Sequence, residues 1–339
     1  MSASVSAIRL GFAGSVGGTP LIRVRSLSEA TGCEILGKAE FMNPGGSVKD
    51  RAANNMVEVA MATGALRPGG VIVEGTAGNT GIGLALMANA VGCTASFVVP
   101  SNQSQEKIDL LRSLGATVEL VPPAPFKEPG NYFHVARRKA EATAGAFWAN
   151  QFENLANADV HYRTTGPEIL VQADGVVDGL VMAAGTGGTI GGTSAFIKER
   201  SPKTSTWLID PAGSGLYSYL KTGEIKSEGS SITEGIGIMR ITANFQRARI
   251  DDAVQGSDAE MLAMAHWVLR HDGLFLGTSA ALNLVGAVKM ARRLGRGKRI
   301  VTILCDGGGR YQSRIYSPEW LAANGFAGSV DQSTLDFVR

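Results

Sequence analysis

The stretch VDGLVMAAGTGGTIGG, residues 177–192, decides the fold class of this chain. Its first half, 177–184, is an apolar run typical of a buried strand, and its second half, 185–192, is rich in glycine. A helical pattern, IGGTSAFIKER at 190–200, follows without a break. A strand that passes through glycines into a helix predicts a parallel α/β sheet, and the backbone N–H groups of such a turn suit a phosphate.

The same alternation of strands and helices recurs along most of the chain. Further strand-like runs are VIVE (71–74), ASFVVP (95–100), TVELV (117–121), STWLID (205–210) and KRIVTILCD (298–306). In SDAEMLAMAHWVLRHDG (257–273) we expect a helix that is capped by Ser257 and ended by Gly273. The alternation predicts an α/β fold with doubly wound lobes, open and mainly parallel sheets, and helices on both faces.

The composition excludes several classes of protein. The chain has 339 residues, a net charge of +2 and no long run of one charge sign, so nothing indicates a nucleic-acid partner. No apolar run reaches the roughly 18 residues that a membrane span needs, and the start MSASVSAIRLGFAG lacks the apolar centre of a signal peptide. Cys33, Cys93 and Cys305 are scattered without C-x-x-C spacing. We therefore expect a cytoplasmic protein without a membrane or nucleic-acid partner.

The stretch NPGGSVKDR (43–51) carries a lysine in an unusual place. Ser47 is a good N-cap and Asp50 comes three residues later, so we expect a helix to begin here with Lys49 in its first turn. A cation at this end opposes the helix dipole, which lowers the pKa of the amine and favours a nucleophilic role for Lys49. The alternative is a surface lysine that extends into water.

The stretch EGTAGNTGIGLA (74–85) places hydroxyl and amide side chains between a strand and a helix. Backbone N–H groups and the side chains of Thr76, Asn79 and Thr80 are suited to bind a carboxylate at the start of that helix. The alternative is a tight turn that needs its glycines only for steric reasons. The clustering of polar side chains favours a ligand.

The loop 185–192 leaves two kinds of phosphate ligand open. The dinucleotide pattern G-x-G-x-x-G fits at Gly185 and Gly187, but Ile190 stands where the third glycine belongs, and Asp210 lies near the position of a ribose-binding acid. A nest of backbone donors this small also fits a single phosphate monoester. No metal is expected, because the histidines have no metal-ligand spacing: His134, His161, His266 and His271.

Taken together, these stretches resemble the fold type II pyridoxal-phosphate enzymes, the tryptophan synthase β family, and within it the cysteine synthases (O-acetylserine sulfhydrylases). The motifs that carry the resemblance are GGTPLIRV (17–24), NPGGSVKDR (43–51), EGTAGNTG (74–81), NQFENLAN (150–157), TTGPEI (164–169), GTGGT (185–189), EGIG (234–237), GTSAA (277–281) and GGGRYQS (307–313). They span about nine-tenths of the chain in the family's order, which makes the set more specific than any one motif.

The resemblance implies a role for each matching residue. Lys49 holds pyridoxal 5'-phosphate as a Schiff base and moves the substrate α-proton, Asn79 bonds the ring oxygen of the cofactor, and Ser279 faces its pyridine nitrogen. The cofactor phosphate is held by Gly185, Thr186, Gly187, Gly188 and Thr189. The substrate is bound by Thr76, Ala77, Gly78, Asn79, Thr80, Gln151 and Gly235.

The resemblance also implies a lobe division and a homodimer. Residues 42–155 form a smaller, mobile lobe with the carboxylate loop, and residues 1–41 and 156–320 form a larger lobe that holds the cofactor phosphate. Residues 321–339 are a C-terminal tail, and the cofactor lies in the cleft between the lobes.

The neutral hydroxyl of Ser279 favours β-elimination, because it leaves the ring nitrogen unprotonated and the cofactor a weaker electron sink. In the implied reaction, O-acetylserine or a similar O-activated serine loses its β-substituent and gives an aminoacrylate. Sulfide then adds to the aminoacrylate and gives L-cysteine. Alternatives are cysteine desulfhydrase, cystathionine β-synthase and serine or threonine dehydratase. Outside this class, a nicotinamide dehydrogenase and a catalytically inactive binding scaffold stay open.

Three departures from the family pattern concern the substrate rather than the cofactor. Ala77 replaces a serine that is common in the carboxylate loop, which removes one hydroxyl donor. Glu234 replaces a common glutamine, and an ionised carboxylate there adds negative charge near the substrate. The segment DGGGRYQS (306–313) replaces a serine-rich version. These changes leave the direction of the reaction, synthase or desulfhydrase, undecided.

Overall fold

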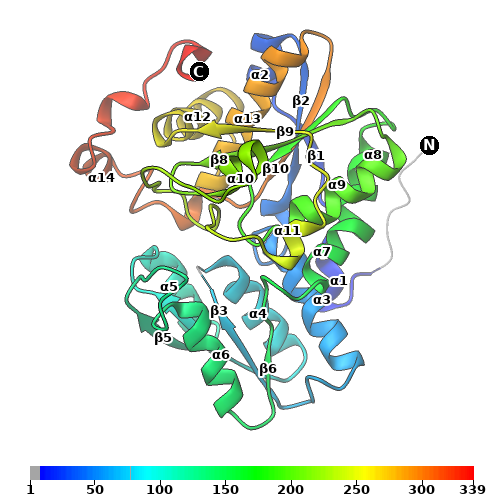
Figure 1. Ribbon diagram of the computed structural model, residues 1–339, viewed down its shortest axis with the longest axis vertical. Coiled ribbons are helices and arrows are strands. Elements are labelled where there is room, and N and C mark those ends of the chain that lie inside the picture. Colours follow the sequence, from blue (N-terminus) through cyan, green and yellow to red (C-terminus); the bar gives the residue numbers. More distant parts are fainter. Residues whose placement is uncertain (1–7, 77) are drawn as a thin grey trace.

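The computed structural model describes residues 8–76 and 78–339, in which helices and strands alternate along the chain (Figure 1). The strands are β1 Leu21–Arg23, β2 Glu34–Ala39, β3 Val71–Gly75, β4 Thr94–Pro100, β5 Thr117–Val121, β6 Ala146–Trp148, β7 Gly179–Met182, β8 Ser205–Pro211, β9 Asp252–Gly256 and β10 Arg299–Leu304.

The helices connect these strands and cover the sheets. They are α1 Gly11–Ser15, α2 Arg25–Thr31, α3 Lys49–Ala62, α4 Asn79–Ala90, α5 Gln105–Ser113, α6 Tyr132–Ala142, α7 Ala156–Val160, α8 Gly166–Gln172, α9 Gly188–Arg200, α10 Leu216–Thr222, α11 Ala243–Gln246, α12 Asp258–Asp272, α13 Thr278–Leu294 and α14 Pro318–Ala323. A π-helical turn, His161–Thr165, joins α7 to α8, and short 3₁₀ turns lie at Glu40–Met42, Gly308–Arg310, Ala327–Ser329 and Leu335–Phe337. Within these described segments, none of the helices combines the length and apolar character that a bilayer span requires.

Two separate sheets organise the molecule (Figure 1). The larger has the order β1-β2-β10-β7-β8-β9, and every pair in it is parallel except β1 with β2. The smaller has the order β5-β4-β3-β6 and is parallel throughout. The predicted α/β fold with open, mainly parallel sheets is therefore confirmed.

Helices cover both faces of the larger sheet because its strands are apolar on both sides. Val181 and Ile209 pack with α12 and α13 on one face, whereas their neighbours Leu180 and Leu208 pack with α8 and α9 on the other. Successive side chains of a strand point to opposite faces, so strands buried on both sides read as continuous apolar runs. This is the reason that 177–184 has no polar alternation.

The smaller sheet follows the same rule. Ile72 and Phe97 pack with α3, α4 and α5, whereas Val73 and Val98 pack with α6 on the opposite face. In the larger lobe, α12 has the expected ends, since Ser257 and Glu260 form a capping box and Gly273 adopts a left-handed conformation with φ 69°. The helix predicted at 257–273 is confirmed with both of its signals.

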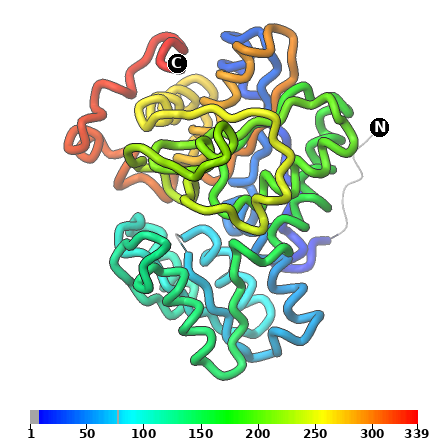
Figure 2. The backbone as a smooth tube through the Cα atoms, viewed as in Figure 1, coloured from blue at the N-terminus to red at the C-terminus, as the bar shows by residue number. Residues whose placement is uncertain are grey.

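The chain enters the smaller sheet after β2 and leaves it before β7, as the colours along the backbone show (Figure 2). We call each sheet with its covering helices a lobe. The lobe boundaries expected at 42–155 and the mobility of the smaller lobe stay predictions. The C-terminal tail packs on α12 and α13, where Arg292 donates to the carbonyl oxygen of Leu335 and Phe337 contacts Trp267.

Candidate active site

A cavity of about 390 Å³ is lined by side chains from both lobes. Most of the residues that the sequence singles out lie on its wall: Lys49, Thr76, Gly78, Asn79, Thr80, Gln151, Gly185, Thr186, Gly187, Thr189, Gly235 and Ser279. Gly188 is not part of the lining, and Ala77 lies outside the described residues. Segments far apart in the sequence therefore converge on one cavity.

Lys49 is the first residue of α3, but the predicted capping arrangement is wrong. Val48 is the residue that precedes the helix, and the hydroxyl of Ser47 accepts only from the Lys49 N–H, at 3.3 Å. The Asp50 carboxylate turns back to accept from the Gly45 N–H at 2.7 Å. The reason is burial, because Asp50 is fully enclosed and its oxygen needs the nearest backbone donor.

The amine of Lys49 has a lowered pKa, as a nucleophilic lysine requires. Its largest cause is burial, which disfavours the ammonium form, and the nearby charge of Lys107 acts in the same direction. Cys305 and Asp306 oppose the shift. Burial, rather than the helix dipole that the sequence suggested, is therefore the main cause.

The loop 185–189 is a backbone cradle at the start of α9. A Cβ atom at Gly185 would lie 2.2 Å from the carbonyl oxygen of Gly235, and one at Gly188 would lie 2.0 Å from Asn157 Oδ1. Gly187 has φ +82°, which side chains rarely adopt. These positions need glycine, and glycine lets the backbone N–H groups approach a phosphate closely.

The carboxylate loop is held by its own side chains. Thr76 Oγ1 accepts from the N–H groups of Gly78, at 3.0 Å, and Gly81, at 3.2 Å. Thr80 donates to Gln151 Oε1 at 2.6 Å, so two residues predicted to bind a carboxylate already contact each other. The loop and Gln151 thus form one pre-arranged wall of the cavity.

The negative charge of Glu234, which the sequence suggested would act on the substrate, is compensated by two cationic side chains. Its carboxylate pairs with Lys107 at 2.6 Å and also with Arg314. Lys107 belongs to α5, which packs on the smaller sheet, so this buried ion pair joins the two lobes at the cavity wall. The expected repulsion of a substrate carboxylate by Glu234 is therefore offset by a lysine.

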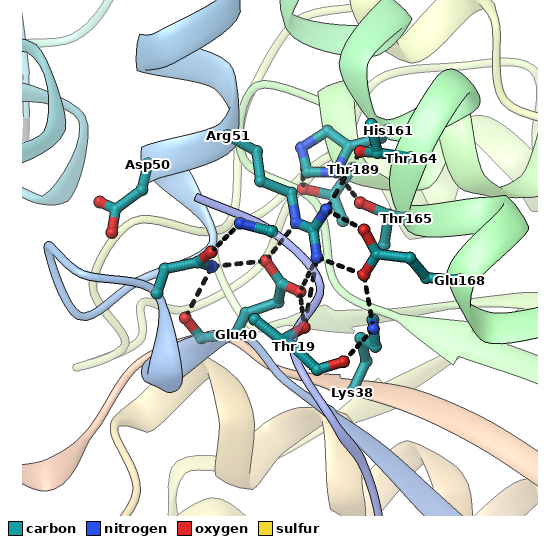
Figure 3. Close-up of polar contacts among 12 residues, drawn as sticks. Thr19, Lys38, Glu40, Asp50, Arg51, His161, Thr164, Thr165, Glu168 and Thr189 are labelled. Atoms are coloured by element: carbon teal, nitrogen blue, oxygen red, sulfur yellow. Dashed lines mark hydrogen bonds and ion pairs between the residues drawn. The ribbon is translucent and has the colours of Figure 1, made fainter. Parts of the chain in front are cut away.

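A buried ion network surrounds Arg51, two residues after Lys49, and was not foreseen from the sequence (Figure 3). The Arg51 guanidinium bonds both oxygens of Glu40 and both oxygens of Glu168 at 2.7–2.8 Å. Lys38 also pairs with Glu168, at 2.6 Å. Burial raises the pKa of Glu168, but the hydrogen bonds and charges of Arg51 and Lys38 outweigh it and bring that pKa to about 2. The network anchors the first turn of α3.

The signal for this network was present in the quoted motifs. Arg51 ends NPGGSVKDR, Glu168 lies in TTGPEI, and Thr19, which accepts from Arg51 at 3.2 Å, lies in GGTPLIRV. The pairing of these residues across 117 positions could not be read from the sequence. Asp306 and Arg310, which hold Asn79, were also missed. No cluster of His, Cys, Asp and Glu suited to a metal occurs in residues 8–76 and 78–339.

The fold and the cavity define a class of enzyme, which comparison with known proteins identifies. Residues 13–306 match the family model "Pyridoxal-phosphate dependent enzyme", and the chain belongs to this family. Its cofactor is accordingly pyridoxal phosphate. The alternative that the chain is a nicotinamide dehydrogenase, which rested on the glycine pattern at 185–192, is therefore wrong.

Individual relatives within this family indicate which enzymes the chain is similar to. The chain is 49% identical to a cysteine synthase of Dictyostelium discoideum, over 98% of this chain and 91% of that protein. A solved O-acetylserine dependent cystathionine β-synthase from Helicobacter pylori superposes with a TM-score of 0.84 and 32% identity, over 92% of this chain and 100% of that one. A hydrogen sulfide-producing enzyme from Fusobacterium nucleatum gives a TM-score of 0.83 and 30% identity, over 90% and 100%.

Proposed function

We propose that this chain is a pyridoxal-phosphate dependent cysteine synthase that forms L-cysteine from O-acetylserine, or a similar O-activated serine, and sulfide. The near full-length likeness to a cysteine synthase supports the substrate class. One observation carries the proposal. Lys49, whose amine has a lowered pKa, lines the same cavity as the glycine loop 185–189 and the loop that contains Thr76, Asn79 and Thr80.

The residues present fit the cofactor. Gly185, Gly187 and Gly188 let the loop pack closely against its neighbours at the start of α9, where backbone N–H groups suit a phosphate. Thr186 and Thr189 add hydroxyls on the cavity wall. Lys49 supplies the amine for the covalent link, Asn79 a donor for the ring oxygen, and Ser279 a neutral hydroxyl for the ring nitrogen. When bound, pyridoxal phosphate withdraws electrons from the substrate α-carbon, so that an α-proton and a β-leaving group can be lost.

The remaining steps belong to side chains of the chain. Thr76, Thr80 and Gln151 bind the substrate carboxylate with the backbone N–H groups at the start of α4. Lys49 takes the α-proton on Nζ and returns it, a role that suits its lowered pKa.

The first test is the visible absorption of the purified protein incubated with pyridoxal phosphate. We expect a band that Lys49→Ala abolishes, with loss of synthesis from O-acetylserine and sulfide. Lys139→Ala, at a partly exposed lysine of α6 that pairs with Glu119 and is not among the residues that line the cavity, is the matched control and keeps the band. A wild-type chain without a band, or a Lys49→Ala variant that keeps it, would contradict the proposal.

A second candidate is cysteine desulfhydrase, which releases sulfide, pyruvate and ammonia from L-cysteine. The structural likeness to a hydrogen sulfide-producing enzyme favours keeping it. The two reactions are separated by comparing turnover of O-acetylserine plus sulfide with turnover of cysteine alone. Sulfide release that is faster than synthesis would assign the chain to the desulfhydrases. A cystathionine β-synthase activity is tested in the same assay, with homocysteine in place of sulfide.

We further propose a cytoplasmic homodimer. The cysteines Cys33, Cys93 and Cys305 are free, as in a reducing compartment. Exposed apolar side chains such as Val171 and Val176 offer surface for a second copy of the chain. Light scattering that gives the mass of one chain would contradict the dimer.

A further inference from the structure

The side-chain amide of Asn79 is held by two charged residues of the segment that follows β10. Asn79 is the first residue of α4 and lines the cavity. Its Nδ2 donates to Asp306 Oδ2 at 2.7 Å, and its Oδ1 accepts from Arg310 Nη1 at 2.6 Å. Neither Asp306 nor Arg310 is among the residues that line the cavity.

These two bonds leave Asn79 one orientation. A half-turn of the amide would bring Oδ1 against the Asp306 carboxylate and Nδ2 against the Arg310 guanidinium, so both bonds would become repulsive contacts. Hydrogen bonds to charged groups are stronger than those between neutral groups, so the turned state is strongly disfavoured. Nδ2 carries two protons, and Asp306 uses one. The other is left for a group in the cavity.

The two charged residues are themselves fixed. Asp306 is fully buried and also accepts from the Tyr311 hydroxyl at 2.7 Å. Gly277 packs so closely that a Cβ atom there would lie 2.1 Å from Asp306 Oδ1. Arg310 donates to the carbonyl oxygen of Gly45, in the turn before Lys49. Asp306 and Arg310 therefore cannot follow Asn79 if it turns.

We propose that Asp306 and Arg310 are positioning residues that orient Asn79, so that its free amide N–H meets the ring of bound pyridoxal phosphate. The inference deepens the proposed function and rests on it for the ring contact of Asn79. It also gives a role to the DGGGRYQS segment, whose departure from the family pattern had no explanation in the sequence.

The test is a double-mutant cycle read by cofactor absorption and cofactor affinity. We expect Arg310→Ala to shift the absorption maximum in the same direction as Asn79→Ala and to raise the cofactor Kd about 10-fold. The double variant Asn79→Ala/Arg310→Ala should show no further change, because Arg310 acts through Asn79. A wild-type spectrum and Kd for Arg310→Ala, or additive effects in the double variant, would overturn the proposal.

Two companion variants separate positioning from folding. Arg310→Lys keeps a cationic donor and should recover part of the wild-type spectrum. Arg314→Ala removes an arginine of the same segment that pairs with Glu234 and not with Asn79, so the absorption maximum should stay in place. A spectral shift in Arg314→Ala equal to that of Arg310→Ala would show a general disturbance of the segment and overturn the assignment.

A last measurement does not depend on the cofactor. In protein as purified and labelled with ¹⁵N-asparagine, the side-chain amide signal of Asn79 is identified by its loss in Asn79→Ala. Arg310→Ala should move this signal, and an unmoved signal would overturn the proposal. If the wild-type chain forms no absorption band, the proposed function fails, and this experiment still decides whether Arg310 orients Asn79.

Discussion

At the scale of single residues, burial sets the protonation of groups beside the cavity. Glu74 ends the run VIVE and is fully buried under the carboxylate loop. Burial raises its pKa to about 8, although hydrogen bonds from Gln151 lower it. Glu74 also helps to raise the pKa of Tyr132, mainly a burial effect, to about 12. A neutral Glu74 places no anion behind the loop that we propose to bind the substrate carboxylate.

This protonation predicts how stability depends on pH. Between pH 4.5, the ordinary pKa, and about 8, the folded chain keeps a proton on Glu74 that the unfolded chain has lost. Stability therefore falls as pH rises through this window, by up to about 1.4 kcal/mol per pH unit from this group. We expect Glu74→Gln to remove that part of the slope in urea unfolding measured at pH 5.5 and 7.5. Parallel slopes for the variant and the wild type would contradict the assignment.

At the scale of elements, the start of α3 is held by the Arg51 network rather than by a cap. Arg51 joins α3 to Glu40, just after β2, and to Glu168 of α8. The network fixes the turn that carries Lys49, so the geometry of this turn depends on two segments outside α3. Sequence reasoning located the helix because propensity and motif are local, but it placed the cap on Ser47, since it could not foresee the burial of Asp50.

Removal of the central cation tests this anchor. We expect Arg51→Ala to lower the free energy of unfolding by about 3–5 kcal/mol, because the buried Glu40 carboxylate loses its cationic partner, while Glu168 keeps Lys38. Arg137→Ala, which breaks an exposed pair with Glu141 in α6, is the control and should cost under about 0.5 kcal/mol. Chemical denaturation measures both variants, and equal losses would show that the network stabilises no more than a surface ion pair does.

At the scale of the whole molecule, two contacts of the cavity wall add to the bonds of Asn79 and Arg51 that already join the lobes. One is the Lys107–Glu234 pair, and the other is Arg240, whose guanidinium lies 4.1 Å from the ring centroid of Phe126 and 4.7 Å from those of Phe133 and Phe152. Phe126 lies in the loop 122–131, so a residue of the larger lobe restrains a loop of the smaller one.

Loss of Arg240 should release this loop. We expect Arg240→Ala to accelerate tryptic cleavage after Lys127 several-fold, because cation–π contacts contribute about 0.5–2 kcal/mol each when desolvated. Lys221→Ala removes a cation–π contact with Tyr217 that lies within the larger lobe, and it should leave this cleavage rate unchanged. Cleavage at the wild-type rate in Arg240→Ala would mean that the loop is held by other contacts.

Much of the architecture and of the cavity wall could be predicted because their signals are local. The apolar runs mark strands buried on both faces, and the loops around Lys49, Asn79 and Gly185 lie where parallel strands end. The partners of these residues could not be predicted. Glu168 with Arg51, Lys107 with Glu234, and Asp306 with Asn79 are pairs between distant segments, and no periodicity in a single sequence encodes such pairing.

The position of β2 beside β10 has a consequence for how the chain folds during translation. Arg299 bonds Glu34 across 265 residues, so β2 leaves the ribosome long before its neighbour exists. At about 5–20 residues per second the wait is on the order of tens of seconds. All strands of the smaller sheet have been synthesised once the chain reaches Trp148, so this sheet can form in the meantime. Nascent chains halted before β10 should therefore expose an unpaired edge of β2, which is prone to pair with other chains.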